Sequence, residues 1–130
     1  MSISVLAVDD SRTMRDMITL ALKDEGFDIS LAEDGQHGLE VLQDSAPPDV
    51  SSTDINMPRL DGCGFIDAAR ARDESRHTPI LVLTTESSSE LKARARDAGA
   101  TGWIVKPFDD EQLVWAIERV APPGTVGGTQ

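Results

Sequence analysis

The sequence has few of the residues that would mark a secreted, membrane-spanning or nucleic-acid-binding protein. Its single cysteine, Cys63, cannot form an internal disulfide, which is typical of a reducing compartment. No apolar run approaches the roughly 20 residues that span a bilayer. Lys and Arg total 12 against 23 Asp and Glu, a formal net charge of −11 that repels phosphate backbones. We therefore expect protein, metal-ion or phosphate-donor partners, with no nucleic acid and no membrane.

What remains is the composition of one globular domain. Hydrophobic residues make up 39% and charged residues 27% of 130 residues, enough to bury a core. The chain opens on an apolar run, Ile3 to Val8, with no basic flank followed by a cleavage site. We therefore expect no signal peptide and a location in the cytoplasm.

Short apolar runs alternate about five times with stretches of helical spacing. The runs predict strands over residues 5–8, 29–32, 50–53, 80–83 and 103–105. The helical stretches carry apolar residues over 14–22, 39–42, 65–69, 91–98 and 113–121. We predict Ser11 as the N-cap of the first helix, Gly26 as its end, and Gly99 as the end of the fourth. The second and third helices are expected after Gly35 and Gly62.

This alternation predicts an α/β fold. Because the strands look apolar on both faces, we expect a parallel sheet with helices covering both sides, a doubly wound arrangement. The domain is expected over residues 1–121. Pro122-Pro123-Gly124 breaks the pattern, and we expect residues 122–130 to form a flexible C-terminal tail.

Polar residues follow four of the predicted strands. Asp9 and Asp10 come after the first, Asp54 after the third, Thr84 at the end of the fourth, and Lys106 after the fifth. Parallel strands bring such residues to one edge of the sheet, where ligands bind in open α/β folds. Each residue alone has an ordinary explanation as a cap, a β-former or a solvated cation. The complementary set at four strand ends favours a functional site.

The chemistry of this set points to phosphoryl transfer. Clustered carboxylates attract a hard divalent cation, and Mg²⁺ shares its coordination with phosphate oxygens. Asp54 can attack phosphorus to form an acyl phosphate. Lys106 and Thr84 can stabilise the transferred charge, and the backbone carbonyl of Asn56 can join Asp9 and Asp10 around the metal.

Several segments in fixed order carry a family resemblance over roughly residues 3–121. They are Val8-Asp9-Asp10-Ser11, Asp54-Ile55-Asn56-Met57-Pro58 with Asp61-Gly62, Leu83-Thr84-Thr85-Glu86, Gly99-Ala100 and Lys106-Pro107-Phe108. Together they resemble the receiver domains of two-component response regulators, most closely the stand-alone chemotaxis regulators of the CheY type. The resemblance implies a flavodoxin-like sheet with strand order 2-1-3-4-5 and a cis Lys106–Pro107 bond.

The resemblance also assigns roles. It implies that Asp54 is the phosphoacceptor, that Asp9, Asp10 and the Asn56 carbonyl bind Mg²⁺, and that Thr84 and Lys106 contact the phosphoryl group. Trp103 stands at the family's switching aromatic, although it could simply be a half-buried packing residue. Asn56 and Glu86 occupy the positions that tune hydrolysis, so we expect a short-lived phosphorylated state.

By this resemblance the protein is a monomeric switch rather than an enzyme, apart from self-phosphorylation and slow autodephosphorylation. A CheA-like histidine kinase would donate the phosphoryl group, and a partner such as the flagellar motor switch would read it. A phosphate sink or phosphorelay intermediate remains an alternative. A Mg²⁺-dependent phosphohydrolase of small molecules is a third, disfavoured because no insertion could form a substrate cap. One departure stands out: Ser51, Ser52 and Thr53 replace apolar residues of the central strand, and we expect reduced stability or bonded hydroxyls.

Overall fold

The computed structural model describes residues 3–122. Within them five strands form one parallel sheet in the order β2-β1-β3-β4-β5, and five helices connect or follow the strands. The strands are β1 (Ser4–Val8), β2 (Asp28–Ala32), β3 (Val50–Thr53), β4 (Ile80–Thr84) and β5 (Gly102–Val105). The helices are α1 (Arg12–Lys23), α2 (Gly35–Asp44), α3 (Gly62–Arg70), α4 (Ser89–Ala98) and α5 (Asp110–Val120). The predicted fold class and strand order are confirmed.

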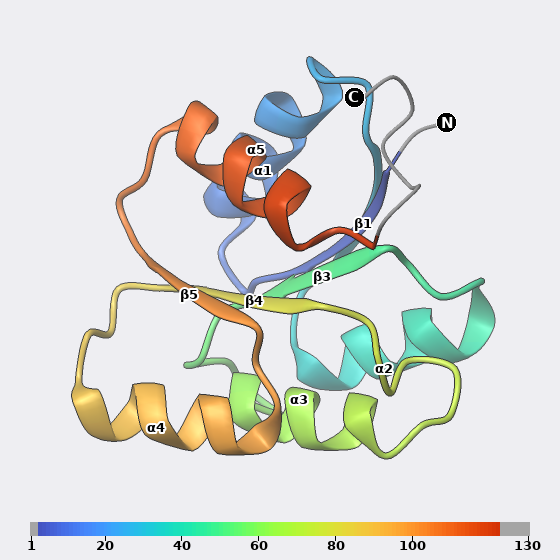
Figure 1. Ribbon diagram of the computed structural model, residues 1–130, viewed down its shortest axis with the longest axis vertical. Helices are drawn as coiled ribbons and strands as arrows, with labels where there is room; N and C mark the ends of the chain where they lie inside the picture. Colours follow the sequence, from blue (N-terminus) through green and yellow to red (C-terminus); the bar gives the residue numbers. More distant parts are fainter. Residues whose placement is uncertain (1–2, 123–130) are drawn as a thin grey trace.

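Helices cover both faces of the sheet. α1 and α5 pack on one side, and α2, α3 and α4 on the other (Figure 1). Side chains alternate along each strand, so every central strand contributes to two cores. On β1, for example, Val5 and Ala7 pack with α1 and α5, whereas Leu6 and Val8 pack with α2 and α3. None of the helices within residues 3–122 is both long enough and apolar enough to cross a membrane.

Each helix begins behind a side chain that caps its first turn. Ser11 accepts from the amide of Met14, as predicted, and Ser88 caps α4 in the same way. α2 and α3 were predicted to follow Gly35 and Gly62, but these glycines are their first residues. The caps are Asp34 and Asp61, whose carboxylates accept the amides of His37 and Gly64.

Gly62 is needed for close approach and not for a turn. A Cβ at this position would collide with the backbone carbonyl of Asp54, so only glycine lets α3 start directly against the end of β3. Two other glycines adopt the left-handed conformation. Gly99 closes α4 in the left-handed conformation (φ 114°), as predicted. α1 ends earlier than predicted, at Lys23, and Gly26 (φ 82°) turns the chain afterwards.

The expectation that all strands are apolar on both faces was wrong for the two edge strands. On β2, Asp28 and Ser30 are exposed, and on β5, Val105 is exposed. An edge strand has a neighbour on one side only, so solvent reaches part of its surface. The three central strands are buried almost throughout.

The hydroxyls of the central strand are buried, as their position implied. Ser51, Ser52 and Thr53 are each at most 2% exposed. Thr53 satisfies its hydroxyl by donating a 2.8 Å hydrogen bond to the backbone carbonyl of Asp54. The predicted flexible tail lies, from residue 123 onward, outside the described residues.

Candidate functional site

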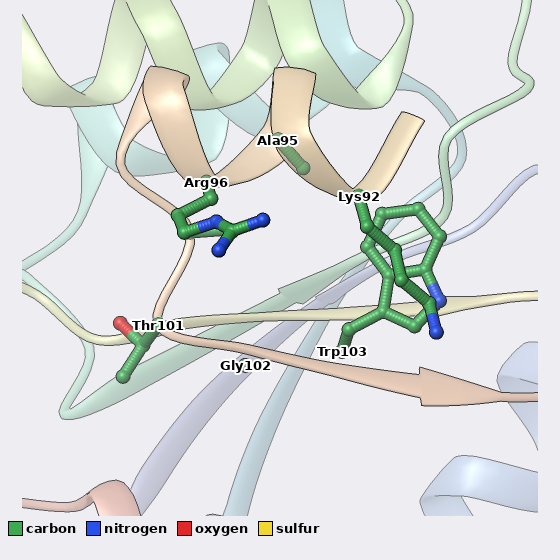
Figure 2. A pocket seen from close by; sticks show the side chains of 7 residues that line it. Lys92, Ala95, Arg96, Thr101, Gly102 and Trp103 are labelled. Atoms are coloured by element: carbon green, nitrogen blue, oxygen red, sulfur yellow. The ribbon is translucent and has the colours of Figure 1, made fainter. Parts of the chain in front are cut away.

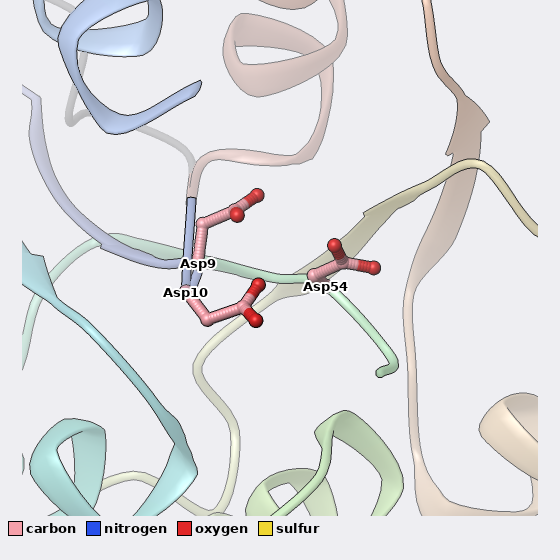
Figure 3. Close-up of side chains that lie close together, drawn as sticks. All are labelled: Asp9, Asp10 and Asp54. Carbon is pink, nitrogen blue, oxygen red and sulfur yellow. The ribbon is translucent and has the colours of Figure 1, made fainter. Parts of the chain in front are cut away.

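Three carboxylates meet at the carboxyl edge of the sheet. Asp9 and Asp10 follow β1, Asp54 follows β3, and these two strands are hydrogen-bonded neighbours. Carboxylate oxygens of all three lie within 4.8 Å of one another (Figure 3). Asp9 is buried, Asp54 half-buried and Asp10 exposed. The structure thus brings together the acidic residues that the sequence placed at strand ends.

Lys106 bridges two of these carboxylates from the end of β5. Its Nζ donates to Oδ2 of Asp9 at 2.7 Å and to Oδ2 of Asp54 at 3.1 Å, and its side chain is only 8% exposed. Burial would lower the pKa of this ammonium group, but hydrogen bonds and charge from Asp9 and Asp54 outweigh burial and raise it. Lys106 is therefore a fixed positive charge facing Asp54. The Lys106–Pro107 bond is cis, as the resemblance implied.

The charged form of the Asp9 carboxylate is disfavoured by burial. Burial raises its pKa, and the hydrogen bonds from Lys106 and from the backbone amide of Ser11 offset this only in part.

The Asp54 carboxylate is fixed by a donor on each oxygen. The amide of Ile55 donates to Oδ1, and Lys106 donates to Oδ2. Asp54 therefore has a defined orientation.

The remaining predicted residues form a second group linked through Glu86. The Asn56 side-chain amide donates to the Glu86 carboxylate at 2.9 Å, joining the loop after β3 to the loop after β4. The Glu86 amide in turn donates to Oγ1 of Thr84 at 3.3 Å. Thr84 is fully buried at the end of β4.

Trp103 belongs to the same group. Its indole Nε1 donates to the backbone carbonyl of Glu86 at 3.2 Å. Glu86 therefore makes hydrogen bonds with Asn56, Thr84 and Trp103. Trp103 is half-buried on β5 beside a groove of about 210 Å³ between α4 and β5. Lys92 and Arg96 of α4 line the same groove (Figure 2).

One structural pair had no signal in the sequence. Arg59 donates to both oxygens of Asp34, at 2.7 and 3.0 Å, from a left-handed backbone conformation (φ 66°). The hydrogen bonds from Arg59 lower the pKa of the Asp34 carboxyl. Next to this pair, the Gly35 amide donates to the carbonyl of Leu60. The loop that carries Asn56 is thereby tied to the start of α2. An acidic residue before a helix suggests a cap, but nothing in the pattern pairs it with Arg59.

The carboxylate cluster suits a divalent cation. All its side-chain ligands are oxygens, as hard cations prefer. Lys106 neutralises one charge of three, so the set retains negative charge in partly buried surroundings. The exposed carboxylate of Asp10 faces solvent, from which an ion would enter. The acidic pocket is thus consistent with divalent metal binding.

Comparison with known proteins identifies the family. The model of the response regulator receiver domain matches residues 5–118, nearly the whole chain. The chain belongs to this family. This receiver is 36% identical over 119 residues to the probable chemotaxis protein CheY of Rhizobium etli, covering 91% of this chain and 92% of that one. The crystallised chemotaxis protein CheY4 of Vibrio cholerae is 42% identical, with a TM-score of 0.88, covering 92% of this chain and 99% of that one.

Other relatives are longer. The transcriptional regulatory protein PdtaR of Mycobacterium tuberculosis is 43% identical over 115 residues, which are 88% of this chain but 54% of that protein. The chain therefore spans about half the length of this relative and nearly all of the CheY proteins. The family match and the likeness to CheY4 establish the receiver family and the CheY-like fold of this chain. The output of the receiver differs among its relatives.

Proposed function

We propose that this receiver accepts a phosphoryl group on Asp54 from a histidine kinase, in a reaction that requires Mg²⁺, and thereby switches its affinity for a partner protein. One observation carries the proposal. The Asp54 carboxylate lies within reach of two other carboxylates and is hydrogen-bonded by the buried Lys106. A nucleophile, a cation site and a fixed positive charge are the parts that phosphoryl transfer needs.

In the proposed step an oxygen of Asp54 attacks the phosphorus of the donor. A P–O bond to Asp54 forms while the P–N bond to the kinase histidine breaks and its electron pair returns to the imidazole. The donors on Asp54, the Ile55 amide and Lys106, orient the carboxylate before attack. Mg²⁺ held by Asp9, Asp10, Asp54 and the Asn56 carbonyl would offset the charge of the phosphoryl oxygens. Lys106 is placed to do the same from the β5 side.

The linkage through Glu86 supports a route for output. The Thr84 hydroxyl can turn toward a new acceptor on Asp54, and the Trp103 indole shares Glu86 with it. We propose Trp103 as the switching aromatic and Asn56 with Glu86 as the residues that tune hydrolysis. No enzymatic activity beyond self-phosphorylation and slow autodephosphorylation is proposed, and the cytoplasmic, monomeric state remains a prediction.

The proposed output is chemotaxis through the flagellar motor switch. Two chemotaxis proteins of the CheY type match this chain over nearly their whole length, which supports a role in chemotaxis. The alternative is a phosphate sink or phosphorelay intermediate for a shared chemotaxis kinase.

A two-part experiment tests this function. The receiver is mixed with a phosphorylated CheA-like kinase, and loss of label from the kinase is followed with wild type and with Asp54→Asn. A flagellar switch peptide is then titrated with the phosphorylated receiver. We expect fast transfer to wild type only, and tighter peptide binding after transfer. Transfer without peptide binding would assign the phosphate-sink role. Equal transfer to Asp54→Asn would contradict the proposal altogether.

A further inference from the structure

Large apolar side chains are exposed mainly on one side of the molecule. Within residues 3–122 four of them are exposed, and three belong to α1 and α5: Met17 at 48%, Leu20 at 67% and Trp115 at 61%. Scattered single residues of this kind are ordinary on a protein surface. Here, however, α1 and α5 are neighbours on the same face of the sheet (Figure 1).

Between these two helices lies a groove of about 300 Å³. Its apolar part consists of Ala21, Val114 and Trp115. All its other lining residues are acidic, and no Lys or Arg lines it: Asp24, Glu25, Asp110, Glu111 and Glu118. The groove therefore combines an exposed aromatic ring with five carboxylates.

Helical spacing shows that each helix presents a second stripe besides its core face. On α5 residues 113 and 117 are buried in the core, and 114, 116 and 120 pack against it. The residues at 111, 114, 115 and 118 repeat the helical spacing one face away, with 114 at the border between the two stripes. On α1 the exposed Met17 and Leu20 lie at helical spacing from Ala21 and Asp24, and these two residues line the groove. A helix that only covers a sheet needs one apolar stripe.

Helix stability accounts for only two of the five carboxylates. Asp110 and Glu111 stand in the first turn of α5, where negative charge is favourable. Asp24 and Glu25 follow the last residue of α1, and Glu118 lies in the last turn of α5. Negative charge at these C-terminal ends opposes the helix dipole. Three of the five acids thus lie where the fold itself disfavours them.

We propose that the face made of Met17, Leu20, Trp115 and this acidic groove docks a basic amphipathic helix or peptide of a partner protein. Leucine-like side chains would cover the apolar stripe, and Lys or Arg would pair with the carboxylates. The guanidinium carbon of Arg119 lies over the Trp115 ring, 5.1 Å from its centroid, so the ring can take a cation on its face.

Charge argues against the other occupants. Two copies pairing through this face would bring two acidic grooves together. Anionic lipid or nucleic acid would be repelled. The segment after Pro122 contains no Lys or Arg, so it has no cation for the groove. The residues that line the groove include none of the proposed phosphorylation residues, so the docking proposal stands or falls separately from phosphorylation.

The test uses the full chain and a synthetic helical peptide of Leu, Lys and Ala, about 15 residues or four turns long. A second peptide with every Lys replaced by Glu is the probe control. Binding is followed by Trp115 emission in a Trp103→Phe background and by amide shifts in ¹⁵N spectra. Glu111→Gln/Glu118→Gln removes two groove charges. Asp44→Asn/Asp73→Asn removes two exposed charges elsewhere and serves as the matched control.

We expect saturable binding of the Lys peptide only, with a blue-shifted Trp115 emission and amide shifts confined to α1 and α5. The groove variant should weaken binding by about threefold or more, and the control by much less. Trp115→Ala should weaken it further. Equal weakening in both charge variants, or shifts spread over the whole surface, would show non-specific attraction and overturn the proposal. Self-association of the chain that Trp115→Ala abolishes would assign the face to a second copy and overturn it as well.

Discussion

Asn56 and Glu86 lie on different loops, yet the amide of one donates a 2.9 Å hydrogen bond to the carboxylate of the other. The loop of Asn56 continues from the β3 end that carries Asp54, and the loop of Glu86 follows Thr84. Two polar groups that can orient a water are thus held together near the proposed phosphorylation site. We expect this pair to shorten the life of the phosphorylated state.

Removing the Glu86 carboxylate should lengthen that life. In Glu86→Ala the amide of Asn56 loses its partner and an acceptor for the attacking water is gone. We expect dephosphorylation to slow by about tenfold to a hundredfold, the scale of a positioned acid–base group. Decay of the phosphorylated mass over time measures it. Glu90→Ala, which removes an exposed carboxylate from the first turn of α4, is the control. An unchanged decay in Glu86→Ala would exclude the tuning role.

Asp10→Ala should weaken Mg²⁺ binding and leave the fold intact. Asp10 is the exposed member of the cluster, so its removal creates no cavity, and it relieves repulsion among three carboxylates. We expect affinity to fall by roughly tenfold and thermal stability without metal to stay equal or rise. Calorimetric titration with Mg²⁺ decides, with the exposed Asp16→Ala of α1 for comparison. The same affinity in both variants would place the metal elsewhere.

Lys106→Met should destabilise the fold, and more at neutral than at acid pH. It leaves the buried Asp9 carboxylate unpaired, a loss of about 3 kcal/mol for a broken buried pair. The pKa of Asp9 is already raised by burial and would rise further without the ammonium group. An acid with a raised folded pKa is stabilised below its unfolded pKa and loses that stability as pH rises through the folded value. The deficit should therefore shrink toward pH 4.

Urea unfolding at both pH values, in EDTA, measures this deficit. Lys92→Met, at an exposed position of α4, should change stability by no more than about 0.5 kcal/mol. A deficit for Lys106→Met that is equal at both pH values would show that Asp9 is not the group left unpaired.

The strand-end rule explains why so much of the site followed from the sequence. Parallel strands end on one edge, so Asp9, Asp54 and Lys106 could be placed together without knowing any side-chain position. The strand order itself came from the family resemblance. Burial of the edge strands was overestimated because an apolar run does not show whether its strand lies in the centre or at the edge of the sheet.

Loop contacts were beyond this reasoning. Arg59 pairs with Asp34 from a left-handed backbone conformation, which the sequence pattern does not reveal for arginine. The Asn56–Glu86 bond depends on how two loops face each other. Likewise, the sequence reasoning took Gly62 as the residue before α3 and did not identify Asp61 as its N-cap. Side-chain geometry across loops is set by packing, which the order of residues does not encode directly.

Trp103 should report the switch. Its indole donates a hydrogen bond to the carbonyl of Glu86, and the amide of Glu86 donates to the Thr84 hydroxyl. A turn of Thr84 toward phosphorylated Asp54 should therefore change the surroundings of the ring. In Trp115→Phe, Mg²⁺ with beryllofluoride, a stand-in for the phosphoryl group, should shift the emission maximum and alter acrylamide quenching. Mg²⁺ alone is the baseline. A spectrum identical to that baseline at saturating analogue would mean that Trp103 only packs.

The central claim is that Asp54 is the phosphoacceptor, and intact mass after treatment with acetyl phosphate and Mg²⁺ tests it most directly. Wild type and the exposed control Asp16→Asn should each gain one phosphoryl group, and the gain should vanish with EDTA. Asp54→Asn keeps the size of the side chain but removes the nucleophilic oxygen, so it should gain none. A full phosphoryl gain on Asp54→Asn would contradict the assignment.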